Sequence, residues 1–260
     1  MQIYLGELLF AELKRTWVQF IRYPAEVIGG IVIITSVFYG LFASAQYMAG
    51  PAMGMGDRLD AIVVGYVLWT LVLYIVNDIA IGLQSEAQSG TLEQVFLSPF
   101  GAARVFFARA IASLALRLTL IVGILLIIMG ITGSRLSFPP LLLLPLGSLL
   151  MAGYGLAFVM GACALIFKRV QQVLGLFQFA LLFLIAAPTE EWSNFVWLTY
   201  LLPMLPSTGL LRDLMARGLG LDWGQWGIAI ANGGLYLLLG LGVFRWAERE
   251  AKRRGNLGGY

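Results

Sequence analysis

The stretch Ala61–Leu83, AIVVGYVLWTLVLYIVNDIAIGL, decides the structural class of this chain. Only Asn77 and Asp78 interrupt its run of apolar and small residues. A helix of about 20 mainly apolar residues is long enough to cross the hydrocarbon core of a bilayer, which is roughly 30 Å thick. The stretch therefore predicts a transmembrane helix and an all-α, polytopic membrane protein.

The composition of the whole chain agrees with this class. Of its 260 residues, 60% are hydrophobic and 12% are charged, whereas soluble domains carry about 45–50% and about 25%. The net charge is +3, and the basic residues flank apolar runs, which argues against nucleic acid as a partner. The chain has no histidine, and its one cysteine, Cys163, lies in an apolar run. A disulfide within the chain and a Cys/His metal site are therefore excluded.

Six runs are candidates for membrane crossings. Each is long and uncharged or nearly so, and Pro139-Pro140 marks the start of the fourth helix, because proline is tolerated only in the first helical turn. The runs are Val27–Gln46, Ala61–Leu83, Val105–Thr132, Leu136–Phe167, Val170–Thr189 and Gly224–Phe244.

A seventh apolar run, Trp192–Leu211, is also long enough to cross, but Pro203 and Pro206 lie in its middle and break a simple helix. Both ends of the chain are rich in Lys and Arg, so the positive-inside rule places both in the cytoplasm. The number of crossings must then be even. We therefore expect six spans, with residues 190–222 forming an outer re-entrant segment that is covered by protein or by a water-filled cavity.

Residues 1–24 predict a helix that does not cross the membrane. Apolar side chains recur at helical spacing, most charges lie off that stripe, and Pro24 ends the pattern. This is typical of an amphipathic helix in the cytoplasmic interface; a helix packed on the protein is the alternative. The stripe consists of Leu5, Leu9, Leu13, Trp17 and Phe20.

A polar cytoplasmic segment, 84–103, separates the second and third runs. Ser85-Glu86-Ala87-Gln88 and Thr91-Leu92-Glu93-Gln94 both fit the capping-box pattern of a helix start, and Gly90 allows a sharp bend between them. From Leu92 the chain can form about two turns with an apolar face before Pro99 ends them. A short helix with an apolar patch in the cytosol predicts a docking site for another protein.

This segment resembles the hallmark of type-2 ATP-binding-cassette (ABC) exporter permeases. The motif is Glu86, then Ser-Gly-Thr-Leu-Glu-Gln from Ser89, then Leu97-Ser98-Pro99 and the basic Arg109 that opens the next span. The likeness extends over nearly the whole chain and includes its length, its six spans, its interfacial helix and an outer Pro…Leu-Arg pattern. That pattern is formed by Tyr200-Leu201-Leu202-Pro203 and Leu211-Arg212. The Gly-Lys that often opens span 3 in the family is replaced by Ala108-Arg109.

The resemblance implies that residues 1–260 form a single permease domain in the inner membrane of a prokaryote. In the family, two such chains form a homo- or heterodimer, and each binds a cytosolic ABC ATPase subunit through the segment 84–103. The resemblance further implies export. The positions that it assigns to coupling are Glu86, Gly90, Thr91, Leu92, Glu93, Leu97 and Pro99.

ATP hydrolysis is expected on the partner subunit. A phosphate-binding loop needs glycine before its lysine, and the three lysines of this chain follow Leu13, Phe167 and Ala251. We therefore expect this chain to be no enzyme and to bind no cofactor, with ATP and Mg²⁺ held by the ATPase. The lack of histidine and of clustered carboxylates within the spans also argues against a membrane-embedded enzyme.

The sequence leaves the substrate open. Apolar spans and an aromatic-rich outer segment favour a drug-like or lipid-like amphipathic molecule. A polysaccharide or a lipid-linked glycan is the rival within the family. An ion-driven carrier or channel is a further alternative, for which Asp78 alone would have to serve as the ion relay.

Two further features of the spans lead to structural predictions. Asp78 and Arg117 are the charges furthest inside them, and such charges usually face the protein and pair. We predict an Asp78–Arg117 contact near the inner gate; two separate charges that reach interfacial water are the alternative. Gly153, Ala157 and Gly161 form a stripe of small residues that permits close helix packing, either within the chain or at a dimer seam.

Overall fold

The computed structural model describes residues 2–49, 56–90, 102–133, 136–167, 170–186 and 196–253, and every regular element in these ranges is helical. The expected all-α class is therefore confirmed for the described part of the chain. The elements are α1 (Gln2–Arg22), α2 (Pro24–Ala49), α3 (Gly56–Gln88), α5 (Ala102–Thr132), the 3₁₀ turn η1 (Pro140–Leu142), α6 (Leu143–Phe167), α7 (Gln171–Ala186), α8 (Val196–Leu201), α9 (Leu205–Met215) and α10 (Trp223–Arg253).

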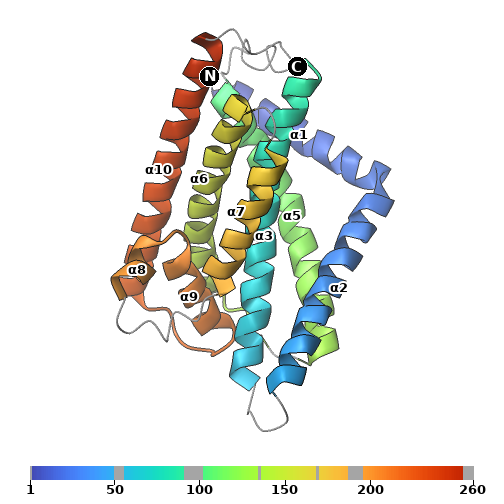
Figure 1. The fold of residues 1–260 in the computed structure, drawn as a ribbon, viewed down its shortest axis with the longest axis vertical. Coiled ribbons are helices and arrows are strands. Elements are labelled where there is room, and N and C mark those ends of the chain that lie inside the picture. Colours follow the sequence, from blue (N-terminus) through green and yellow to red (C-terminus); the bar gives the residue numbers. More distant parts are fainter. Residues whose placement is uncertain are drawn as a thin grey trace.

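The long helices run side by side, and the short ones lie at the two ends of the bundle (Figure 1). Helix α1 crosses one end, which we call the α1 end; α3, α6 and α10 finish there, and α5 and α7 begin there. Helices α8 and α9 lie at the opposite end, which we call the α9 end. The N-terminal helix and the last turn of α10 are thus at the same end of the bundle.

Four helices among the described residues are long and apolar enough to cross a membrane, namely those over Asp60–Glu86, Ala108–Thr132, Pro140–Phe167 and Trp223–Arg253. They correspond to the second, third, fourth and sixth predicted spans. The first and fifth predicted spans coincide with α2 and α7, whose described apolar stretches are shorter, Ile28–Gly40 and Gln171–Ile185. Membrane-spanning character is therefore shown for four helices, and six spans remain a prediction.

Helix α6 packs between α3 and α10, and the small residues of α6 determine how closely these helices approach it. A Cβ on Gly161 would lie 2.8 Å from Cδ1 of Leu83, and one on Gly153 would meet Val72 at 3.8 Å. These two glycines therefore face α3, and Ala157 between them is fully buried. The stripe serves packing within the chain, so its use as a dimer seam is wrong.

The outer segment breaks where the sequence predicted. Helix α8 ends at Leu201, and Met204, just before α9, has a φ of 66°, which is a left-handed conformation. With 6 and 11 residues, α8 and α9 are about 9 and 16 Å long at 1.5 Å per residue. Neither helix can cross a membrane alone, as expected for this part of the segment 190–222.

Candidate functional site

The end of α3 leads into the segment that the sequence singles out. Ser85 lies in the last turns of α3, whose helix continues to Gln88, so the capping box predicted to start a helix at Ser85 is wrong. Helix α3 continues through this pattern because the backbone groups of these residues already form hydrogen bonds within the helix. At its end, for example, Ser89 N donates to Ser85 O at 2.9 Å. Gly90 then adopts a φ of 70°, a common way to end a helix. The helix thus ends where the sequence allows a bend, and the second piece of the predicted bend lies outside the described residues.

The rest of the predicted coupling motif lies outside the described residues. These positions are Thr91, Leu92, Glu93, Leu97 and Pro99. Of the positions assigned to coupling, Glu86 and Gly90 are described; Glu86 lies in the last turn of α3, and Gly90 lies in the turn that follows it.

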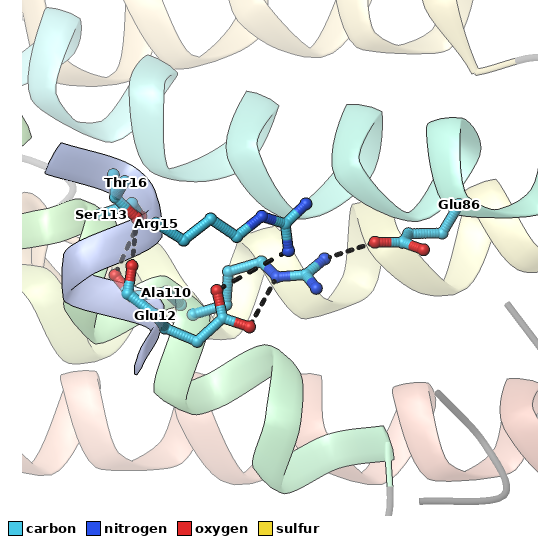
Figure 2. Close-up of polar contacts among 7 residues, drawn as sticks. Glu12, Arg15, Thr16, Glu86, Ala110 and Ser113 are labelled. Atoms are coloured by element: carbon cyan, nitrogen blue, oxygen red, sulfur yellow. Dashed lines mark hydrogen bonds and ion pairs between the residues drawn. The ribbon is translucent and has the colours of Figure 1, made fainter. Parts of the chain in front are cut away.

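A cluster of charged side chains joins α1, α3 and α5 near the end of α3 (Figure 2). Arg109, near the start of α5, donates from Nη1 to Glu86 Oε1 at 2.8 Å and from Nε to Glu12 Oε1 at 3.5 Å. Arg15 Nη1 lies 3.8 Å from Glu12 Oε2. Two arginines and two carboxylates balance in charge, so the cluster can be held partly buried at the junction of the three helices.

The placement of Glu12 is the least expected part of this cluster. Its exposed fraction is only 8%, although an acid on an interfacial helix would be expected to face water. One turn along α1, Thr16 Oγ1 donates to the backbone oxygen of Glu12 at 2.7 Å. The sequence did not single out Glu12 as a site residue. The feature that could have indicated it is its position on the flank of the apolar stripe.

A polar pocket of about 170 Å³ opens beside the cluster. Gly82 leaves room for it, because a Cβ there would meet no atom within 4 Å. Within the described residues, no group of three or more Asp, Glu, Cys or His side chains could hold a metal ion. The pocket is lined by Glu12, Arg15, Thr16, Gly82, Ser85, Glu86 and Arg109.

A second ion pair lies deeper along the same two helices. Arg117 donates to Asp78 from Nε at 3.2 Å and from Nη2 at 2.7 Å, a bidentate arrangement. The Arg117 guanidinium carbon also lies 4.6 Å from the centre of the Tyr74 ring, in a cation–π geometry. The predicted contact between Asp78 and Arg117 is therefore present, and Tyr74 is a partner that the sequence did not reveal.

The ion pairs Arg109–Glu86 and Arg117–Asp78 both connect the antiparallel helices α3 and α5. We call these two pairs the ladder. On α3, Glu86 follows Asp78 by about two turns; on α5, Arg117 follows Arg109 by the same interval. Acids therefore stand on α3 and arginines on α5 in matching register. This ladder ties together the two helices that flank residues 91–101.

Helix α1 turns its charged cluster inward and an apolar strip outward. Large side chains at Phe10, Leu13, Trp17 and Ile21 are exposed, while Glu12 on the opposite side contacts the bundle. Leu13 and Trp17 belong to the stripe that the sequence predicted, but Leu9 and Phe20 are partly buried. The outward strip is thus rotated relative to the expected one, because Glu12 is drawn to Arg109.

At the α9 end, Asn232 of α10 holds the broken backbone of the outer segment. Its Nδ2 donates to the carbonyl oxygens of Tyr200 and Leu202 at 2.9 and 3.1 Å, and its Oδ1 accepts from Met204 N at 3.3 Å. Backbone that leaves a helix inside a protein needs such partners. A polar residue in the middle of an apolar run was the signal for Asn232.

Arg212 of α9 binds the end of α7. Its Nη2 donates to the carbonyl oxygen of Ile185, which the helix itself leaves without an intrahelical donor. Burial lowers the pKa of the Arg212 guanidinium, although the adjacent carboxylate opposes this shift. Burial also raises the pKa of Asp213, a shift that Arg212 opposes. The Leu211-Arg212 pair of the sequence motif therefore has a structural contact in this chain.

Comparison with known proteins adds no assignment. No family model matches the chain, and a search of curated proteins finds no match.

Proposed function

We propose that this chain is the transmembrane permease subunit of an ATP-driven ABC exporter in the inner membrane of a prokaryote. In this proposal six helices cross the membrane, both ends of the chain are cytoplasmic, and residues 190–222 dip into the membrane from outside. A second permease chain and two cytosolic ATPase subunits complete the transporter. ATP and Mg²⁺ bind to the ATPases, and this chain catalyses no reaction.

The observation that best supports this proposal is the ladder of ion pairs beside the predicted coupling segment. Arg109 joins Glu86 and Glu12 at the α1 end, and Arg117 joins Asp78 about 12 Å further along the helices. A loop that only connects two spans needs no such reinforcement. A segment that receives force from another protein does, because a loose connection would absorb the movement.

The mechanism follows from this arrangement. When ATP binding draws the ATPases together, the segment 91–101 is pushed, and the ladder makes α3 and α5 move together. The contact of Arg109 with Glu12 carries the same movement to α1. The bundle then alternates between a pathway that is open to the cytoplasm and one that is open to the outside.

The proposed substrate is an amphipathic drug-like or lipid-like molecule. The candidate spans are apolar, and the mid-span acid Asp78 is engaged with Arg117. An acid held in a bidentate ion pair is poorly suited to be the relay of an ion-driven carrier, so this contact favours coupling to ATP over coupling to an ion gradient.

Affinity purification in mild detergent tests the proposal. We expect wild-type chain from native membranes to co-purify with a soluble subunit that carries a G-x-x-x-x-G-K-[ST] loop, and a Thr91→Arg/Leu92→Asp variant to lose it. Leu219→Asp, at the exposed α9 end, is the control and should retain the subunit. Purification of the wild-type chain without any ATPase, in several detergents, would overturn the proposal.

A further inference from the structure

We propose that the outward face of α10, near its C-terminal end, is a binding site for anionic phospholipids, whose phosphate groups contact Arg245 and Arg249. This inference does not depend on the proposed transport function. It rests on the placement of exposed and buried side chains around α10, on the ion pairs of its last turns and on the spacing of its tryptophans.

The buried and exposed faces of α10 lie on opposite sides of the helix. Gly240, Phe244 and Ala247 are buried against the bundle. A Cβ on Gly240 would fall inside the backbone of Gly155, so α10 lies directly on α6. At 100° per residue, Leu238 and the two arginines project from the side opposite this buried face.

The outward face changes from apolar to basic along the helix. Leu238 is 71% exposed, and Trp246, one residue after Arg245, is 60% exposed. Arg245 and Arg249, one turn apart, continue the same face and are both exposed. Along the helix, Leu238 is followed by Arg245 and Trp246 at one level and then by Arg249, which matches the order of acyl chain, interface and headgroup in a lipid leaflet.

Within the described residues, Arg245 and Arg249 have no carboxylate at ion-pair distance. The next two basic residues do: Lys252 Nζ lies 2.8 Å from Glu248, and Arg253 Nη1 lies 3.8 Å from Glu250. The acids of this helix end thus offset the last two cations and leave the first two charges available. A pair of guanidinium groups one turn apart suits a phosphate, which accepts hydrogen bonds from both.

The tryptophans of α10 place these arginines at headgroup depth. Trp223 at the start of α10 and Trp246 near its end are both exposed and are separated by about 35 Å along the helix, slightly more than the roughly 30 Å of a hydrocarbon core. Tryptophans at both boundaries are typical of a membrane-spanning helix. Arg245 then lies at the boundary, and Arg249 lies about 6 Å beyond it, among the phosphates.

Native mass spectrometry of the purified full chain, with any subunits that accompany it, tests the proposal. The sample is supplied with equal amounts of phosphatidylglycerol and phosphatidylcholine that have the same acyl chains, and the ratio of bound lipids is measured. We expect wild type to prefer phosphatidylglycerol. In Arg245→Gln/Arg249→Gln the preference should fall roughly fivefold for each arginine removed, as expected from about 1 kcal/mol per basic residue near a membrane surface.

Two further variants separate a lipid site from a general effect of charge or folding. Lys252→Gln/Arg253→Gln removes the same charge from cations that already have acidic partners, so its preference should change much less. Arg245→Lys/Arg249→Lys should keep most of the preference. A wild type without preference for the anionic lipid would overturn the proposal. So would an equal loss in the two glutamine variants, or a change of oligomeric state without a change in bound lipid.

Discussion

Asp78 and Arg117 form an ion pair inside two helices that are apolar enough to cross a membrane. Removing either partner leaves the other charge without its counterion. Because the two side chains keep 24% and 32% exposure, the loss should be smaller than the roughly 3–5 kcal/mol of a fully buried pair. We predict that Asp78→Asn and Arg117→Gln each lower the free energy of unfolding by about 1–3 kcal/mol.

The exchange of the two charges separates a specific pair from two independent charges. Asp78→Arg combined with Arg117→Asp should recover at least half of the stability that Asp78→Arg or Arg117→Asp alone loses. Thermal or denaturant unfolding in one detergent would measure this. A double variant that is no better than the single variants would mean that each charge reaches interfacial water on its own.

Replacement of Asn232 should destabilise a segment outside its own helix, α10. Its amide contacts the backbone on both sides of the break between α8 and α9. Replacement by leucine keeps the branched shape of the side chain but leaves buried carbonyl and amide groups without partners, at a cost of about 1–3 kcal/mol. We predict that Asn232→Leu loses stability and makes the 196–204 region cleavable by added protease, whereas Gln225→Leu, on an exposed turn of α10, does neither.

Among the described helices, α6 and α10 pack most closely, and glycines make this possible. A Cβ on Gly155 or Gly240 would overlap the backbone of the other helix. Gly147 on α6 and Gly242 on α10 have nothing within 4 Å of the same position. We predict that Gly155→Ala and Gly240→Ala lose about 1–3 kcal/mol or more through overpacking. The controls Gly147→Ala and Gly242→Ala should be neutral or up to about 1 kcal/mol more stable; a similar loss in all four variants would contradict this packing.

Helix α1 should lie with its outward strip in the membrane interface. In a Cys163→Ala background, single cysteines at Phe10, Leu13, Trp17 and Ile21 should react with a membrane-impermeant maleimide several-fold more slowly than a cysteine at Arg22. The reason is that the strip faces lipid, whereas Arg22 is exposed on the polar flank of α1, more than 90° around the helix from most of the strip. Equal labelling of all five positions in vesicles with the α1 end outside would show that the strip faces water.

The sequence predicts the helices better than their orientations. Apolar length is a local property, so helix positions, the break at Pro203 and the role of Pro24 could be predicted from the chain alone. The capping pattern at Ser85 failed because the preceding apolar helix continues through it. Whether the glycines of α6 face α3 or a second chain depends on three-dimensional packing, which one sequence does not contain.

The candidate site was predicted in part for the same reason. Asp78, Glu86, Arg109 and Arg117 stand out because charges near or inside apolar runs are costly and therefore informative. Glu12 does not stand out, since an acid on an amphipathic helix is ordinary until a distant arginine is known to face it. Contacts between helices far apart in the chain are thus the part that the pattern of residues leaves undetermined.

On the scale of the whole molecule, the two ends of the bundle have different construction. The α1 end joins three helices through charged side chains around the ends of α3 and α5. The α9 end joins broken helices through backbone contacts made by Asn232 and Arg212. We interpret the first as the part that receives movement from a cytosolic partner, and the second as a fixed outer cap.

Photocrosslinking in native membranes tests this central claim most directly. A photoreactive amino acid is placed at Gln88, the exposed last residue of α3, and separately at Leu219, exposed at the α9 end. The account predicts an adduct between the Gln88 position and a soluble protein with a phosphate-binding loop, and no such adduct from Leu219. Absence of the adduct at Gln88, or equal adducts from both ends of the bundle, would contradict it.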